Sequence, residues 1–222
     1  MPMRTWGGLI ALAAVGALGV TALLAVLRVG PDAPMAASVL PADQPQSTAT
    51  EAAYPLPAFT LTNQMDQQVT RDDLLGRVWV ADFIFTRCMG PCPVLTHNMA
   101  QLRDRLRDEP GLDLDQIRLV SFSVDPEHDT PQVLRDYAQR YGAEPSQWWF
   151  LTGPREALWP LIEQGFKLAV SDDPTNTQMP IAHSTKWALV DKQGVIRGYY
   201  SGLDERDQTR LIADLRRLLE EP

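Results

Sequence analysis

Cysteine is nearly absent from this chain: there are two, Cys88 and Cys92, among 222 residues. A disulfide between residues so close in sequence closes too small a loop to constrain the unfolded chain much, so the pair is a poor structural brace. Positive charge is also scarce, since 20 Lys and Arg against 28 Asp and Glu give a net charge of −8. Nucleic-acid binding requires a basic surface, and this composition argues against it. The sequence also lacks internal repeats, a phosphate-cradling loop and a Ser-His-Asp order, and nothing in it calls for an organic cofactor.

One long apolar run stands at the N-terminus. Gly7–Leu27 is apolar apart from Thr21, and its length matches the ~20 residues that a helix needs to cross a bilayer. The apolar region of a secretory signal is usually only about 7–15 residues long. The sequence therefore predicts an uncleaved, single-pass transmembrane helix within residues 1–28, with Met35-Ala36-Ala37 as an alternative cleavage site.

The flanks of this run indicate a location. Arg4 and the terminal amine precede it, which favours a cytoplasmic N-terminus and a soluble domain in the periplasm. No Arg- and Ser-rich presequence is present, so a bacterial inner membrane is favoured over a mitochondrial one. Residues 29–53 are rich in Pro, Ala, Ser, Thr and Gln without a hydrophobic period, which predicts a flexible linker that spans about 25–30 Å. The folded domain is then expected over residues 54–222.

Strand-like and helix-like segments alternate through this domain. The expected strands are Ala58–Thr62, a segment around Val69, Val78–Phe85, Ile117–Val124, Trp148–Leu151, Lys186–Asp191 and Val195–Tyr200. The expected helices are Val94–Asp108, Gln132–Tyr141, Pro154–Gln164 and Asp204–Leu219. The order predicts an α/β fold in which helices flank a mixed sheet, with an N-terminal β-hairpin. With two thiols at the first long strand-to-helix turn, the best match is a thioredoxin-like fold carrying an extra hairpin and an inserted helix.

The two cysteines lie one helical turn apart at that junction. The free N–H groups and the dipole of a helix N-terminus favour the thiolate, which binds metal and attacks disulfides. A static disulfide and two inert core thiols are less favoured alternatives, because Gly90 and Pro91 indicate a shaped loop. Thioredoxin-type enzymes place two residues between their cysteines, whereas three intervene here. A soft ion, Cu(I) or Zn(II), and a reversible disulfide both remain open, although zinc usually takes four ligands and Cu(I) two or three.

The chain has three histidines to complete such a site. His97 follows Cys92 by five residues and is expected to be a surface or packing residue. His128 lies in a charged loop and is expected to be solvated. His183 directly precedes a late strand, and in a thioredoxin-like topology the loop before this strand passes beside the dithiol. His183 is therefore the candidate third ligand.

Three motifs in order carry a resemblance to a known family. They are Phe83-Ile84-Phe85-Thr86-Arg87-Cys88-x-x-x-Cys92-Pro93, Ser123-Val124-Asp125-Pro126-Glu127-His128-Asp129-Thr130-Pro131, and His183-Ser184. With these motifs the chain resembles the SCO/SenC family of copper chaperones, which help to assemble cytochrome c oxidase. The resemblance covers the N-terminal anchor and roughly Pro57–Leu219.

The resemblance implies roles for particular residues. Cys88, Cys92 and His183 would be the copper ligands, and Asp125 would support the site from its loop. Two positions depart from the family pattern. Ala182 stands where an acidic residue often precedes the histidine, and His128 stands where the family usually has Arg or Lys. These departures alter the surroundings of the ligands and leave the copper affinity open.

The leading interpretation is a membrane-tethered metallochaperone, a carrier rather than an enzyme. It binds Cu(I), with Cu(II) left open, and passes the ion to the oxidase subunit that carries the CuA centre; other copper carriers or thiol reductants are further partners. The alternative is a thiol–disulfide oxidoreductase that uses Cys88 and Cys92 as a redox-active pair to reduce the CuA cysteines. A peroxiredoxin-like peroxidase is disfavoured because Ile84 stands where that family has a threonine, four residues before its cysteine.

Overall fold

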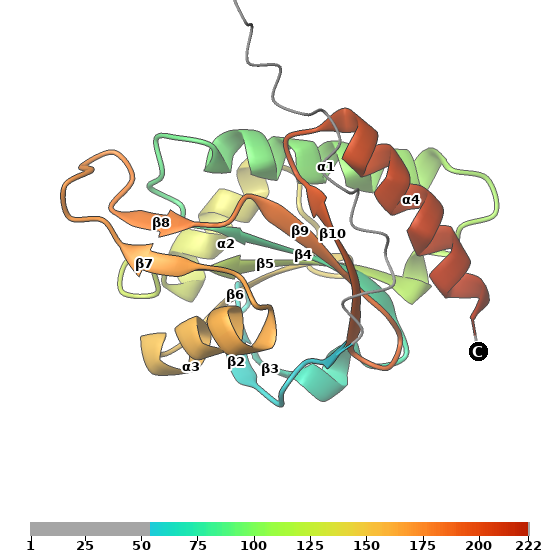
Figure 1. Ribbon diagram of the computed structural model, residues 1–222, viewed down its shortest axis with the longest axis horizontal. Coiled ribbons are helices and arrows are strands. Elements are labelled where there is room, and N and C mark those ends of the chain that lie inside the picture. The colour runs from blue at the N-terminus through green and yellow to red at the C-terminus, as the bar shows by residue number, and fades with distance from the viewer. Residues whose placement is uncertain (1–53, 222) are drawn as a thin grey trace, which may run out of the picture. The chain divides into compact units, whose positions relative to one another are not determined.

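The computed structural model describes residues 54–221, which form an eight-stranded mixed sheet with helices on both faces (Figure 1). The predicted membrane anchor, residues 1–28, and the predicted linker, residues 29–53, lie outside the described residues. Among residues 54–221, no helix combines the length and the apolar character needed to cross a membrane.

The sheet has the strand order β1-β10-β9-β4-β5-β6-β2-β3. Its strands are β1 Tyr54–Pro55, β2 Thr60–Asn63, β3 Gln68–Thr70, β4 Val78–Ile84, β5 Ile117–Ser123, β6 Trp148–Thr152, β9 Lys186–Val190 and β10 Val195–Ser201. The α-helices are α1 Cys92–Asp108, α2 Pro131–Arg140, α3 Arg155–Pro160 and α4 Glu205–Glu220. Short 3-10 helices span Arg71–Leu74 and Leu114–Gln116.

The central strands explain why the sheet forms. Every residue of β4 and β5 is buried, as expected for central strands of a sheet that is covered on both faces. β4 pairs in parallel with β5 and antiparallel with β9, and β2 with β3 forms the predicted N-terminal hairpin. The predicted mixed sheet is therefore confirmed.

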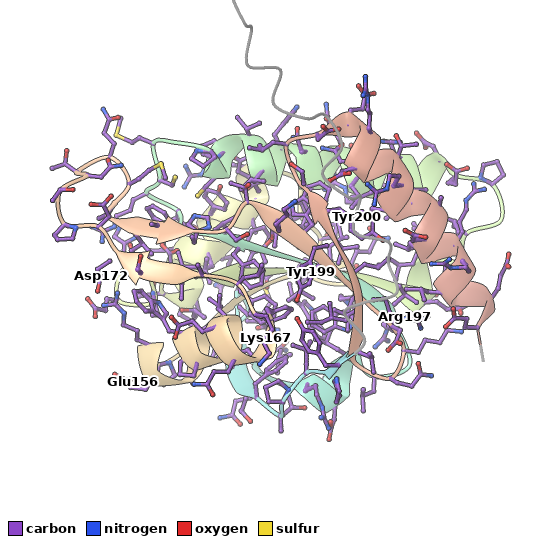
Figure 2. All side chains as sticks on the ribbon, viewed as in Figure 1. Glu156, Lys167, Asp172, Arg197, Tyr199 and Tyr200 are labelled. Atoms are coloured by element: carbon purple, nitrogen blue, oxygen red, sulfur yellow. The ribbon has the colours of Figure 1, made fainter. Side chains whose placement is uncertain are left out.

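Helices cover both faces of this sheet. α1 and α4 lie over one face and α3 lies over the other (Figure 1). Neighbouring side chains of β10 point to opposite faces of the sheet. The Tyr199 hydroxyl donates to the carbonyl of Phe166 (2.5 Å), which follows α3, whereas the Tyr200 hydroxyl donates to Asp214 of α4 (2.6 Å) (Figure 2). At the start of α2 the Thr130 side chain accepts a hydrogen bond from Val133 N, and Pro131 takes the predicted first helical position.

Two helices differ in detail from their predicted ranges. α1 begins at Cys92, two residues before the predicted start at Val94, so Cys92 belongs to the first turn. The predicted helix Pro154–Gln164 divides into α3 and a π-helical turn, Leu161–Gly165. Pro160 lies at the join and has no N–H to continue the α-helical ladder, which accounts for the wider turn.

A second, two-stranded sheet was not predicted. β7 (Val170–Asp172) and β8 (Ile181–His183) pair antiparallel, apart from the main sheet, and Val170 lies opposite His183. His183 therefore ends a short strand of its own, three residues before β9 begins at Lys186.

Candidate metal centre

The two cysteines lie where β4 runs into α1. Cys92 is fully buried as the first residue of α1, and Cys88 is buried in the loop before it. Both are free thiols. The Cys88 sulfur accepts a hydrogen bond from Gly90 N (3.3 Å), and the Cys92 side chain lies close enough to perturb its pKa. The sulfurs thus lie together at a helix N-terminus, as predicted.

This arrangement separates the acidities of the two thiols. The Cys92 side chain lowers the pKa of Cys88 to about 6, against an opposing effect of burial, and backbone N–H groups of Cys92 and Gly90 add to the lowering. The Cys88 side chain, together with burial, raises the pKa of Cys92. At neutral pH Cys88 therefore carries the thiolate, and Cys92 keeps its proton.

His183 brings an imidazole nitrogen to this pair. Its Nε2 lies 3.3 Å from Cys92 Sγ, and its Nδ1 lies 3.0 Å from the carbonyl oxygen of Ser184. A carbonyl only accepts, so Nδ1 carries the hydrogen and the lone pair of Nε2 faces the thiols. Burial lowers the pKa of His183 and keeps the ring neutral. Phe85 packs edge-on against the ring with centroids 5.7 Å apart.

The three predicted ligands are therefore linked through Cys92: one contact joins it to Cys88 and another to His183. Within residues 54–221, no group of three or more His, Cys, Asp or Glu side chains is already arranged to hold a metal ion. The donor set nevertheless fits a soft ion, because it offers two sulfurs and a neutral imidazole with its lone pair directed at them. Binding would require the Cys92 thiol to lose its proton and the two sulfurs to turn to a common point.

The other predicted residues lie around this pair. Asp125 is buried and accepts a hydrogen bond from Arg87 Nε (2.6 Å), so its carboxylate is paired with a residue of the dithiol loop. His128 is half exposed and its Nδ1 lies 3.0 Å from Asp129 Oδ1, which agrees with its exclusion as a ligand. His97 is exposed on α1, as predicted.

Asp129 is a supporting residue that the sequence reasoning did not single out. Its fully buried carboxylate accepts hydrogen bonds from Thr86 N (3.1 Å), Thr86 Oγ1 (2.5 Å) and Ser123 Oγ (2.6 Å). Thr86 follows β4 and Ser123 ends β5, and the ends of neighbouring parallel strands meet at one edge of the sheet. That shared position was the signal available in the sequence. Asp129 therefore joins the loop that carries Cys88 to the loop after β5.

Asp82 is a second residue that the sequence reasoning missed. It is fully buried in β4, and neither carboxylate oxygen has a hydrogen-bond partner among the described residues. Burial raises its pKa to about 7, with Ser121 on the neighbouring strand opposing the rise. Its negative charge in turn raises the pKa of Cys92. A carboxyl group in a run of apolar residues was the signal that could have found it.

Comparisons with known proteins all point to one family. The SCO1/SenC family model matches residues 47–220. A SCO1 protein homologue of Bacillus subtilis is 34% identical over 164 residues, which is 73% of this chain and 82% of the homologue. A putative copper-binding protein of Stutzerimonas stutzeri is 33% identical over 144 residues, covering 65% of this chain and 68% of that protein. The solved structure of BsSco is 33% identical to this chain with a TM-score of 0.67, and the match covers 77% of this chain and 96% of BsSco. BsSco is described as a member of the Sco family of cytochrome c oxidase assembly proteins that has a disulfide switch.

Proposed function

Because this chain belongs to the SCO1/SenC family, we propose that it is a copper metallochaperone that assists assembly of the CuA centre of cytochrome c oxidase. Copper is its cargo, held by Cys88, Cys92 and His183. The observation that carries the proposal is the 3.3 Å approach of His183 Nε2 to Cys92 Sγ. A disulfide exchanger needs no neutral imidazole with its lone pair directed at the buried thiol, whereas a three-coordinate Cu(I) site does. Relatives described as a copper-binding protein and as an oxidase assembly protein support the assignment.

The residues divide the work of binding. Cys88 already carries a thiolate at neutral pH and is the first sulfur available to the ion. Cys92 gives up its proton as the second sulfur binds, which makes copper uptake release a proton. His183 supplies a neutral nitrogen, since Ser184 fixes its tautomer. Arg87, Asp125 and Asp129 hold the loop that presents Cys88.

A thiol–disulfide oxidoreductase is the second candidate function. The observation in its favour is the pKa of Cys88, about 6, beside a second thiol. In that reaction the Cys88 thiolate attacks a disulfide of the oxidase subunit, and Cys92 then displaces the mixed disulfide. Two electrons pass to the subunit, its two cysteines are reduced, and Cys88 and Cys92 end as a disulfide. The disulfide switch described for BsSco makes this candidate worth testing in the same chain.

The proposed location follows from the N-terminal sequence. Residues 1–28 would anchor the chain in a bacterial inner membrane, residues 29–53 would act as a linker, and residues 54–222 would face the periplasm. The acceptor oxidase lies in the same membrane. The linker would then raise the effective concentration of the copper site near the acceptor without any direct contact.

Copper loading of the reduced chain tests the proposal. We expect one Cu(I) per chain with two cysteine sulfurs and one nitrogen in its first coordination shell, measured by X-ray absorption at the copper edge. Cys88→Ser or Cys92→Ser should abolish stable binding, and His183→Ala should remove the nitrogen. Val94→Ala, which alters an exposed residue of α1 near the thiols, is the matched control. A shell of four sulfurs, or loss of the copper to a mild chelator, would refute the copper-carrier assignment.

A further inference from the structure

A methionine sulfur lies beside the dithiol loop. Met179 is in the loop between β7 and β8, and its side chain fills the space in front of Gly90. A Cβ atom added to Gly90 would lie 2.3 Å from Met179 Sδ and 3.7 Å from Cys88 Sγ, so these two sulfurs are at most about 6 Å apart. Figure 2 shows sulfur atoms gathered where the β7–β8 loop meets the start of α1.

Backbone hydrogen bonds hold Met179 in this position. Its N–H donates to the carbonyl oxygen (3.2 Å) and the side-chain oxygen (3.0 Å) of Asn176, which closes a tight turn. The next contact joins the two loops, because Met89 N donates to the carbonyl oxygen of Gln178 (3.3 Å). The loop that carries Met179 is therefore fastened to the loop that carries Cys88.

The glycine at position 90 accommodates this thioether. Gly90 does not have a positive φ, unlike Gly76, Gly111, Gly142 and Gly194, so its backbone does not require glycine. What glycine provides there is room for Met179 Sδ. The side chain is partly buried rather than sealed in the core, and methionine is unbranched, so small rotations would move its sulfur toward Cys88.

The chemistry of a thioether suits a temporary ligand. It is soft, neutral and weak, and among common ions it selects Cu(I). His183 approaches the Cys92 side of the pair, whereas Met179 lies near Cys88. We propose that Met179 Sδ is an exchange ligand that takes the place of His183 on Cu(I) while both cysteines remain bound. This inference rests on the proposed copper-binding function.

The exchange balances without any other reactant. The Cu–N bond to His183 breaks and a Cu–S bond to Met179 forms. One neutral donor replaces another, so copper stays Cu(I), the charge of the site is constant and no proton moves. This arrangement would help a carrier to release its copper. The ion keeps three ligands when His183 leaves, and the thioether of Met179 binds weakly enough for a ligand of the acceptor to displace it.

Copper-edge X-ray absorption on selenomethionine-labelled chains tests the exchange. Full-length His183→Ala, loaded with Cu(I) alone, should show one selenium atom in the copper shell together with two sulfurs. The double variant His183→Ala/Met179→Leu should lose the selenium from the copper shell. In competition with a Cu(I) chelator it should bind Cu(I) about tenfold more weakly than His183→Ala does, which is the low end of the loss in affinity expected when a contact in a metal site is removed. Met179→Leu conserves volume at a partly exposed position and should fold normally, which unfolding in urea checks.

The control is His183→Ala/Met89→Leu, which alters the neighbouring exposed methionine and should keep the selenium. If selenium is absent from His183→Ala, or is lost with Met89→Leu rather than Met179→Leu, the exchange role is refuted. Those results leave the proposed function intact as long as the chain with His183 binds Cu(I) through two sulfurs and a nitrogen. Failure of that binding in the unsubstituted chain is a different outcome and overturns the copper-carrier assignment itself.

Discussion

Asp129→Asn is the sharpest test of how the fold holds the dithiol loop. The Asp129 carboxylate is fully buried and accepts two hydrogen bonds from Thr86 and one from Ser123. Asparagine keeps the shape but removes the charge and replaces one acceptor oxygen by a donor. The hydroxyls of Thr86 and Ser123 can turn to accept from the new amide, whereas the Thr86 N–H can only donate.

The expected cost follows from these contacts. A hydrogen bond to a charged group contributes roughly 1.5–3 kcal/mol. In Asp129→Asn the amide oxygen can keep the bonds from Thr86 N and Ser123 at the Oδ2 position while the Thr86 hydroxyl turns to accept from the amide nitrogen, so all three bonds lose their charge assistance. We therefore expect Asp129→Asn to lower the free energy of unfolding by about 2–4 kcal/mol. Thr86→Val removes the hydroxyl but keeps the backbone bond, and should cost about 1–2 kcal/mol.

Urea unfolding followed by tryptophan fluorescence measures both changes. Arg107→Gln is the control, because it removes an exposed ion pair with Asp104 on α1, worth less than about 1 kcal/mol. The alkylation rate of Cys88 is the second readout, and it should change in Asp129→Asn and stay constant in Arg107→Gln. An Asp129→Asn chain as stable as the control, with unchanged alkylation, would refute the role of Asp129 in holding this loop.

Four further predictions concern the site and the tether. His183→Ala should weaken Cu(I) binding by about tenfold or more, as judged by chelator competition, but leave dithiol oxidation broadly intact; crippled oxidation with unchanged affinity would favour the reductase. Iodoacetamide labelling of the copper-free chain should show a midpoint near pH 6 for Cys88 and little reaction at Cys92, and equal reactivity would contradict the opposite pKa shifts of the two thiols. Asp82 keeps its proton to about pH 7 in the folded chain but loses it near pH 3.8 in the unfolded chain. The free energy of unfolding should therefore fall as the pH rises between those values, with a slope approaching about 1.4 kcal/mol per pH unit. A pH series should show that Asp82→Asn flattens this slope. Deleting residues 1–28 behind a cleavable export signal should lower oxidase assembly at native expression without altering copper affinity, and full assembly would show that the anchor is dispensable.

The main sheet could be predicted because its signals are local. The buried strand Val78–Ile84 is an almost unbroken apolar run, and Thr130-Pro131 marks a helix start through the side-chain cap of one residue and the fixed φ of the other. The positions of Cys88 and Cys92 followed from the junction between such a strand and a helix. His183 was identified because it precedes a strand that the topology places beside that junction.

The rest depends on contacts between distant segments. β7 and β8 are short strands with one buried residue each, Val170 and Ile181, so they carry no hydrophobic period. Asp129 and Met179 gain their positions from partners more than 40 residues away, Thr86 and Gly90. Propensity and spacing do not contain that information.

The separate β7–β8 sheet has a consequence for the dynamics of the protein. Cys88 and Cys92 belong to the edge of the main sheet and α1, whereas His183 ends a two-stranded sheet that pairs with none of the main strands. An ion bound by all three residues would add metal–ligand bonds to the few contacts that already join the hairpin to the dithiol loop, such as the hydrogen bond from Met89 N to the Gln178 carbonyl. Amide protons of the hairpin should then exchange with solvent faster in the copper-free chain than in the loaded one, while those of β4 and β5 change little. A partner protein that contacts this hairpin could thereby distinguish the copper-loaded chain from the copper-free chain, because the hairpin is more rigid in the loaded one.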